Sequence, residues 1–100
     1  MLIVLAKAHV GKDAMEAVTA AIAVMVAASN AEAGCIAYAF TQDVLQPGVL
    51  HITEKWTDEA ALAAHFATPH MAAFGAAIAA LDFKVIEAVK YHADEGSPVM

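Results

Sequence analysis

Arginine is absent from this chain of 100 residues, and cysteine and tryptophan each occur once. The five basic residues are all lysines, and eleven acidic residues bring the formal net charge to −6. An acidic chain that lacks the two-pronged guanidinium group is poorly suited to binding phosphate, so we predict no nucleic-acid partner. The lone cysteine, Cys35, excludes an intramolecular disulfide and a zinc site built from cysteines.

Long apolar segments are missing as well. The longest uninterrupted apolar run, residues 20–28, is far shorter than the roughly 18 residues that a transmembrane helix needs. The apolar start, residues 1–6, lacks the basic region and the cleavage site of a signal peptide. We therefore expect a cytoplasmic protein without a membrane partner.

Apolar residues make up 61% of the chain, and many of them are alanines. A chain of this length predicts one domain, which we assign to residues 1–93. Residues 94–100 contain glycine, serine and proline, and we expect them to form a flexible C-terminal tail. Because small domains bury a modest share of their surface, the apolar excess predicts that a second copy covers part of it.

Hydrophobic periodicity and turn residues divide the chain into strands and helices. We expect strands over residues 2–10, 35–41, 49–56 and 83–92. We expect helices over residues 12–29, after a cap at Thr57 or Asp58, and after the Thr68-Pro69 pair. The order β-α-β-β-α-β predicts an α+β, ferredoxin-like fold, in which a four-stranded antiparallel sheet carries its helices on one face.

The other face of that sheet has no element left to cover it. Side-chain alternation groups Ile36, Tyr38 and Phe40 on one face of their strand, with Cys35 on the opposite face. We expect these large residues and those of the next strand to lie on the uncovered face, namely Tyr38, Phe40, Leu50, Ile52 and Trp56. Since water is a poor environment for so many apolar groups, we predict a homodimer that forms through this sheet face.

The segment from Glu54 to His70 carries the residues that are most suited to chemistry. It holds the only tryptophan, Trp56, at a predicted strand end, and it holds His65 on the helix that follows. His70 lies beside the next helix start. Imidazoles titrate near neutral pH, and beside an indole and an apolar helix face they indicate a small pocket for an aromatic substrate.

Four short blocks of sequence are similar to one known family. They are Glu32-Ala-Gly-Cys-Ile-Ala-Tyr38, Glu54-Lys-Trp-Thr-Asp58, the run from Ala60 to His65, and Ala67-Thr-Pro-His70. Together they resemble the antibiotic biosynthesis monooxygenase (ABM) family, and within it the small quinol monooxygenases. The resemblance implies a dimeric α+β barrel with a ligand cleft in each subunit between the sheet and the helices. Two positions depart from the pattern: Ala33, where proline is usual, and His51, where many relatives have an apolar or aromatic residue.

The resemblance further implies a cofactor-independent monooxygenase that oxidises a small polycyclic phenol, anthrone or hydroquinone with molecular oxygen. Such a substrate supplies its own electrons once it is deprotonated, so the protein has to take a proton and hold the anion in a dry pocket. Three alternatives stay open: a non-catalytic dimeric protein that binds a small ligand, a haem-degrading enzyme, and an isomerase of the same superfamily.

For this reaction we predict that His65 is the general base and that Tyr38 orients a substrate oxygen. The residues that we predict to bind substrate are Trp56, His51, Phe66 and His70. The resemblance implies that no cofactor is needed. We also predict no metal ion, because the histidines have no metal-binding spacing and Pro69 separates His65 from His70.

Each of these residues also has a structural interpretation. In that interpretation, His65 has no catalytic role and its ring nitrogens bond to backbone or to a carboxylate. Trp56 then belongs to the core or to a dimer interface, and Tyr38 is buried with its hydroxyl group hydrogen-bonded. A helix N-terminus disfavours the imidazolium form of His70, which favours a structural role. Glu54 shares a face with Trp56, and we expect it to form a structural ion pair with a lysine of this or the other subunit.

Overall fold

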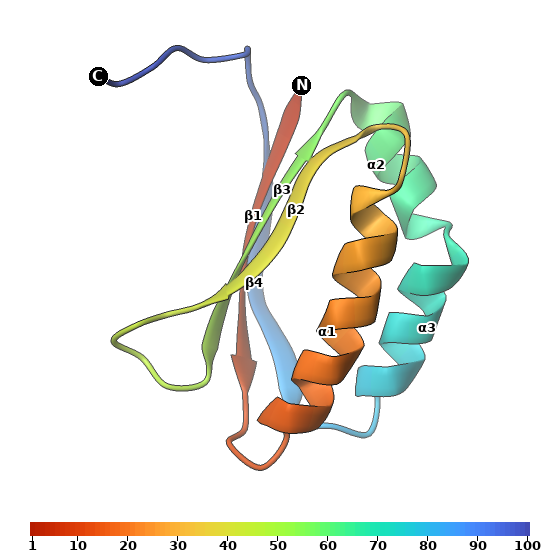
Figure 1. Ribbon diagram of the computed structural model, residues 1–100, viewed down its shortest axis with the longest axis vertical. Coiled ribbons are helices and arrows are strands. Elements are labelled where there is room, and N and C mark those ends of the chain that lie inside the picture. The colour runs from red at the N-terminus through yellow and green to blue at the C-terminus, as the bar shows by residue number, and fades with distance from the viewer.

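The computed structural model describes residues 1–100 as one layer of sheet and one layer of helices (Figure 1). The elements in chain order are β1 (Leu2–Val10), α1 (Met15–Asn30), β2 (Cys35–Gln42), β3 (Val49–Trp56), α2 (Glu59–Phe66), α3 (Pro69–Ile78) and β4 (Phe83–His92). The strands form one antiparallel sheet in the order β2-β3-β1-β4. All three helices lie on the same side of it. This arrangement confirms the predicted ferredoxin-like fold.

The two short helices begin where their capping residues predict. The Asp58 side chain accepts a hydrogen bond from the backbone N–H of Ala61 at 2.8 Å. The Thr68 hydroxyl oxygen accepts one from Met71 N–H at 3.3 Å, and Pro69 occupies the first helical position. The same hydroxyl donates to the carbonyl oxygen of His65 at 2.7 Å, so one side chain joins the end of α2 to the start of α3.

Helix α1 begins three residues later than the pattern predicts. Residues 12–14 form a turn in which Ala14 N–H donates to the carbonyl of Gly11 at 3.0 Å. The Gly11 N–H in turn donates to the carbonyl of Asp82 at 3.0 Å, just before β4. This contact holds the corner between β1 and α1 against the entry to β4, which explains why the first residues after Gly11 turn instead of entering the helix.

A β-bulge at the start of β2 changes which residues share a face. Cys35 pairs with Trp56, whereas Ala37 pairs with Lys55, so Ile36 is the extra residue between them. The prediction that Ile36 shares the face of Tyr38 is wrong, because one inserted residue reverses the alternation. Ile36 is half exposed, and Cys35 packs against the core instead.

The large residues that we assigned to an uncovered sheet face lie under the helices instead. The buried members are Tyr38, Leu50, Ile52 and Trp56, and Phe40 packs partly buried against the same core. The even-numbered residues of β1 and β3 face the helix layer, so these side chains form the core between sheet and helices. That part of the argument for a dimer is therefore wrong. The prediction that His51 lies opposite Trp56 is confirmed, since neighbouring β3 residues alternate.

The opposite face of the sheet is still uncovered within the chain (Figure 1). Its apolar residues include Leu5 of β1 and Val89 and Tyr91 of β4, each about half exposed, and Lys7 forms an ion pair with Glu87 at 3.9 Å beside them. Beyond Ala93, which donates its N–H to the carbonyl of Met1 at 2.9 Å, the chain forms no further helix or strand. No helix in the structure is long and apolar enough to cross a membrane.

The turn between β2 and β3 depends on Gly48, which has a φ of 81° and whose missing Cβ would lie 2.6 Å from the carbonyl oxygen of Val10. We expect Gly48→Ala to lower the free energy of unfolding by at least ~1–2 kcal/mol, because an L side chain is strained in this conformation. Gly75 of α3 has open space around it, so Gly75→Ala is expected to raise the free energy by up to about 1 kcal/mol. Urea unfolding of both variants tests this, and equal effects would contradict it.

Candidate functional site

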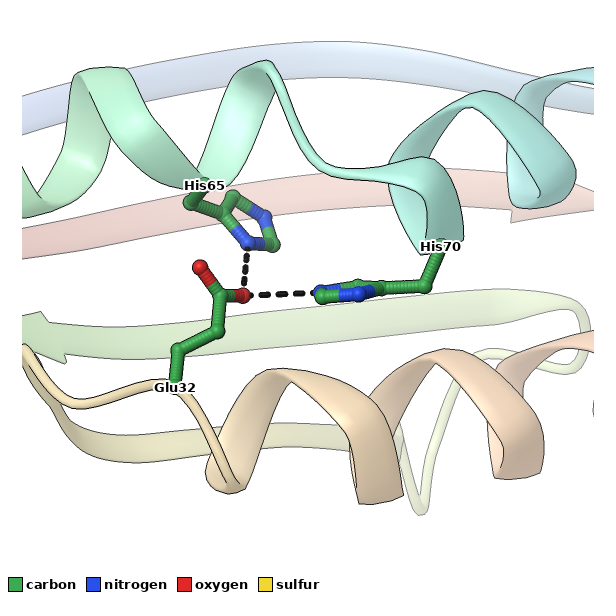
Figure 2. Close-up of side chains that lie close together, drawn as sticks. All are labelled: Glu32, His65 and His70. Carbon is green, nitrogen blue, oxygen red and sulfur yellow. Dashed lines mark hydrogen bonds and ion pairs between the residues drawn. The ribbon is translucent and has the colours of Figure 1, made fainter.

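One carboxylate and two imidazoles meet at the end of the helix layer (Figure 2). Glu32 lies in the turn after α1, His65 lies near the end of α2, and His70 lies in the first turn of α3. The Glu32 Oε2 atom is 2.7 Å from His65 Nδ1 and 2.8 Å from His70 Nε2. The His65 side chain is 1% exposed, and those of Glu32 and His70 are 14% and 19% exposed. We call these three residues the Glu–His–His cluster.

Because both ring nitrogens face the same carboxylate oxygen, each is a hydrogen-bond donor to ionised Glu32. His65 then carries its proton on Nδ1, which leaves the lone pair of Nε2 free to accept a proton. Figure 2 shows the ring of His65 with Nδ1 turned toward Glu32 and its other nitrogen turned away. A carboxylate that fixes one imidazole tautomer and aims the other nitrogen is the arrangement that a general base requires.

Aromatic rings enclose His65 on the sheet side. The centroid of its ring lies 4.6 Å from that of Trp56 and 5.3 Å from that of Tyr38. Trp56 is fully buried, and its indole Nε1–H donates to Glu54 Oε1 at 2.9 Å. No lysine of this chain pairs with Glu54; the indole bonds to this carboxylate from the same strand instead. Burial raises the pKa of Glu54, and the hydrogen bond from Trp56 opposes that rise.

Tyr38 is buried with its hydroxyl against a sulfur atom. The phenol O–H donates to Met25 Sδ at 3.7 Å, and the hydroxyl of buried Ser29 donates to the same sulfur at 3.5 Å. Burial, together with the nearby charge of Glu54, raises the pKa of the Tyr38 phenol, so the group stays protonated and acts as a donor. A thioether is a weak acceptor, and a substrate oxygen would be a stronger one in its place.

Two hollows flank α1 on opposite sides. A cleft of about 200 Å³ lies between α1 and α3, and its lining is apolar except for His70: Ala21, Val24, Met25, Ala73, Phe74 and Ala77. A shallower groove of about 380 Å³ lies between α1 and β2, and Tyr38 and Phe40 form part of its wall. His70 therefore connects the Glu–His–His cluster to the cleft, and Met25 stands between the cleft and the Tyr38 hydroxyl.

The structure brings five of the six predicted site residues together and sets one, His51, apart. The rings of Tyr38, Trp56, Phe66 and His70 all lie within 5.9 Å of the ring of His65, centroid to centroid. His51 lies on the other face of the sheet and pairs with Asp43 at 2.8 Å, and this hydrogen bond lowers the pKa of Asp43. A substrate bound at His65 does not reach His51, because the sheet lies between them. Phe66 is 64% exposed, although its ring centroid is 5.6 Å from that of His65.

Sequence reasoning missed Glu32 as a site residue and treated the five-residue spacing of the two histidines as an argument against a shared site. The break at Pro69 turns the chain so that both imidazoles point at Glu32. The available signal was the position of Glu32 at the start of the Glu32–Tyr38 block.

The model of one protein family, described as antibiotic biosynthesis monooxygenase, matches residues 1–77 of the chain. The chain belongs to the antibiotic biosynthesis monooxygenase family. Among solved structures, a Deinococcus radiodurans protein that bears the family name is 25% identical, with a TM-score of 0.91 over 100% of this chain and 99% of that one. Another antibiotic biosynthesis monooxygenase is 30% identical, with a TM-score of 0.82 over 94% and 99% of the two chains.

Rv0793 from Mycobacterium tuberculosis is 26% identical to this chain, with a TM-score of 0.84 over 96% and 98% of the two chains. No curated protein matches the chain by sequence. The solved structures thus support the family and its ferredoxin-like fold over the full length of the chain, and they support a monooxygenase-like function in general terms.

The raised pKa of Glu54 makes stability depend on pH. A raised carboxyl pKa means that the folded state binds the proton more readily, so stability is lost as the pH rises above about 4.5 and through the folded-state pKa. We expect Glu54→Gln, which keeps an acceptor for Trp56, to be more stable than the wild type near pH 7. This advantage should shrink toward about pH 4, where the Glu54 side chain of the wild type is protonated and therefore as uncharged as the glutamine that replaces it.

Urea unfolding at the two pH values measures the difference. Glu59→Gln is the matched control, since Glu59 is 51% exposed and pairs with Lys90 at the surface at 3.1 Å. A Glu54→Gln variant that is less stable than the wild type near neutral pH would show that the charge of Glu54 is stabilising there.

Proposed function

We propose that this protein is a monooxygenase that oxidises a small phenol or hydroquinone with molecular oxygen, without a bound cofactor, and that His65 is its general base. The observation that supports this most directly is the hydrogen bond between Glu32 and His65 Nδ1, because it leaves the free lone pair of Nε2 inside an aromatic, water-poor surrounding. Membership of the family supports the reaction class.

Glu32 has two effects on His65 in this mechanism. It selects the tautomer that has its proton on Nδ1, and its negative charge stabilises the imidazolium that forms when Nε2 takes a substrate proton. A buried imidazole without such a partner would pay the cost of charging in a poorly solvated place. The carboxylate thus makes proton transfer possible at a residue that is 1% exposed.

The other residues of the cluster hold the substrate anion. The Tyr38 hydroxyl, which stays protonated, can donate to a substrate oxygen once the sulfur of Met25 moves aside. Methionine has a flexible, unbranched side chain, so this movement costs little compared with moving a helix. Trp56 packs against the ring of His65, with the two ring centroids 4.6 Å apart, so it holds the imidazole in place behind the substrate.

The deprotonated substrate supplies the electrons that reduce oxygen. A hydroquinone that gains one oxygen atom leaves as a hydroxyquinone, and the second oxygen atom leaves as water with two of the substrate's hydrogens. No external reductant is consumed. The protein's contribution is the proton transfer, the orientation of the anion and the exclusion of water, which the apolar lining of the cleft supports.

The cleft volume favours substrates at the small end of the predicted range. A cavity of about 150 Å³ accommodates one benzene ring, and the cleft between α1 and α3 measures about 200 Å³. One-ring hydroquinones therefore fit the cleft with little change, whereas a three-ring anthrone is too large for it.

Oxygen uptake tests the function and its base together. We expect the chelator-treated, flavin-free protein to consume oxygen with a panel of hydroquinones and anthrones above the autoxidation rate. His65→Gln should lower that rate by ~10²–10⁴-fold, the usual contribution of a general base. His92→Gln is the control, because His92 is 76% exposed and its partner Glu59 lies outside the cluster. Full activity of the His65 variant would refute the assigned base, and no uptake across the panel would refute the function.

We further propose that two copies associate through the sheet face that the helices do not cover. Leu5, Val89 and Tyr91 present apolar surface there, and a second sheet packed on this face would remove it from water. The resemblance to the family implies a dimeric α+β barrel, which is consistent with this association.

Substitution of a residue at the centre of this face tests the association. We expect the wild type to sediment as a dimer and Leu5→Glu to sediment as a monomer, because an unpaired charge would be buried in the interface. Leu45→Glu places the same charge in the loop between β2 and β3, where Leu45 is 86% exposed, and it should remain dimeric. A monomeric wild type, or a dimeric Leu5→Glu variant, would contradict the assignment.

A further inference from the structure

We propose that Glu32, His65 and His70 bind one divalent ion of the first transition series. The three residues come from separate parts of the chain, and each offers one ligand atom: Oε2 of Glu32, Nδ1 of His65 and Nε2 of His70. All three atoms lie within 4.8 Å of one another. This site goes beyond the proposed oxygenase function, which requires no metal ion.

The distances leave room for an ion after small side-chain adjustments. Two ligand atoms that are each about 2.1 Å from a shared ion at a tetrahedral angle lie roughly 3.4 Å apart. The carboxylate oxygen is 2.7 and 2.8 Å from the two nitrogens, so these contacts have to lengthen by about 0.6–0.7 Å. Figure 2 shows the three side chains converging on one point from three segments of the chain.

The chemistry of the ligands selects the class of ion. Two imidazoles and one carboxylate suit zinc, iron(II), cobalt(II) or nickel(II), whereas calcium and magnesium prefer oxygen ligands alone. A neutral imidazole can carry its proton on either ring nitrogen. When the proton is on the nitrogen away from the ion, the nitrogen that faces the ion has a free lone pair to bind it. Three protein ligands leave at least one coordination position for water or another small ligand.

The site is accessible from solvent at Glu32 and His70. The side chains of Glu32 and His70 keep 14% and 19% of their surface exposed, and His70 also lines the cleft between α1 and α3. His65 forms the closed inner wall, with Trp56 packed behind it. An ion at this position thus has a route from solvent.

Metal binding and base catalysis make opposite demands on His65. When Nδ1 binds an ion, the ring proton resides on Nε2, so the nitrogen that we assign as the base becomes a donor. A loaded site would therefore suppress oxygen uptake that depends on His65. The two proposals can fail separately, because metal binding is read by spectroscopy and oxygen uptake is measured on chelator-treated protein.

Titration with cobalt(II) tests the site on the full chain after treatment with a chelator. We expect visible absorption bands of low-symmetry, four- or five-coordinate cobalt that saturate at one ion per chain, and zinc should displace them. His70→Ala and Glu32→Ala should each weaken binding by at least ~10-fold. His92→Ala should bind like the wild type, because it removes the histidine of a surface pair with Glu59 and leaves the cluster intact.

The outcomes are distinct. Circular dichroism of each variant checks that it folds, and His70→Gln provides a milder replacement if His70→Ala does not. Absence of the cobalt bands, or binding that survives loss of His70 and Glu32, would overturn the metal site and identify the cluster as a hydrogen-bonded tie between helices. Oxygen uptake by metal-free protein would still support the oxygenase function in that case. Saturable binding without oxygen uptake would support the metal site and refute the oxygenase.

Discussion

The carboxylate of Glu32 is the constraint on which the candidate site depends. A single oxygen atom accepts hydrogen bonds from two imidazoles that belong to different helices, while its own backbone lies in a third segment, the turn after α1. A largely buried carboxylate is costly unless donors surround it, and two buried or half-buried imidazoles need acceptors of their own. The three groups satisfy one another, so the turn after α1, the end of α2 and the start of α3 are held at one point.

Two glutamates lie close to His65, and their surroundings give them different properties. Glu32 faces two imidazoles and is partly exposed, whereas Glu54 is buried on β3 and bonds to the indole of Trp56. Burial raises the pKa of Glu54, and the same low-dielectric environment keeps the phenol of Tyr38 protonated. Separate environments for chemically similar groups are a common way to assign separate roles within one small site. Here they leave Glu32 to orient His65 and leave Glu54 to anchor Trp56.

The fold positions this cluster at one end of the helix layer (Figure 2). The helix layer covers one face of the sheet and buries Leu50, Ile52 and Trp56, whereas the opposite face exposes Leu5 and Val89 beside the Lys7–Glu87 ion pair. The ferredoxin-like fold and the family are shared with the solved relatives over nearly their whole length. Because one fold supports several chemistries, the reaction has to be argued from the Glu–His–His cluster and its cleft.

Local pattern in the sequence was sufficient for the elements of the fold. The caps at Asp58 and Thr68, the proline at the start of α3 and the alternation along β3 depend on near neighbours. They therefore determined the starts of α2 and α3, and they placed His51 and Trp56 on opposite sides of the sheet. The choice of which β3 face meets the helices is not a local property, since alternation is symmetric with respect to the two faces. The bulge at Ile36 depends on pairing with β3, and no neighbour of Ile36 reveals it.

The candidate site likewise has features that the local sequence predicts and features that depend on tertiary structure. His65, His70, Tyr38 and Trp56 were identifiable from their types and positions, because imidazoles and aromatic rings beside predicted helix and strand ends indicate a pocket. The role of Glu32 and the meeting of the two imidazoles were decided by tertiary structure alone: Glu32 lies 33 positions before His65 and 38 positions before His70, and only the packing of the helix layer brings them together. A hydrogen bond across that distance leaves no periodic trace in the sequence, whereas a cap or a strand does.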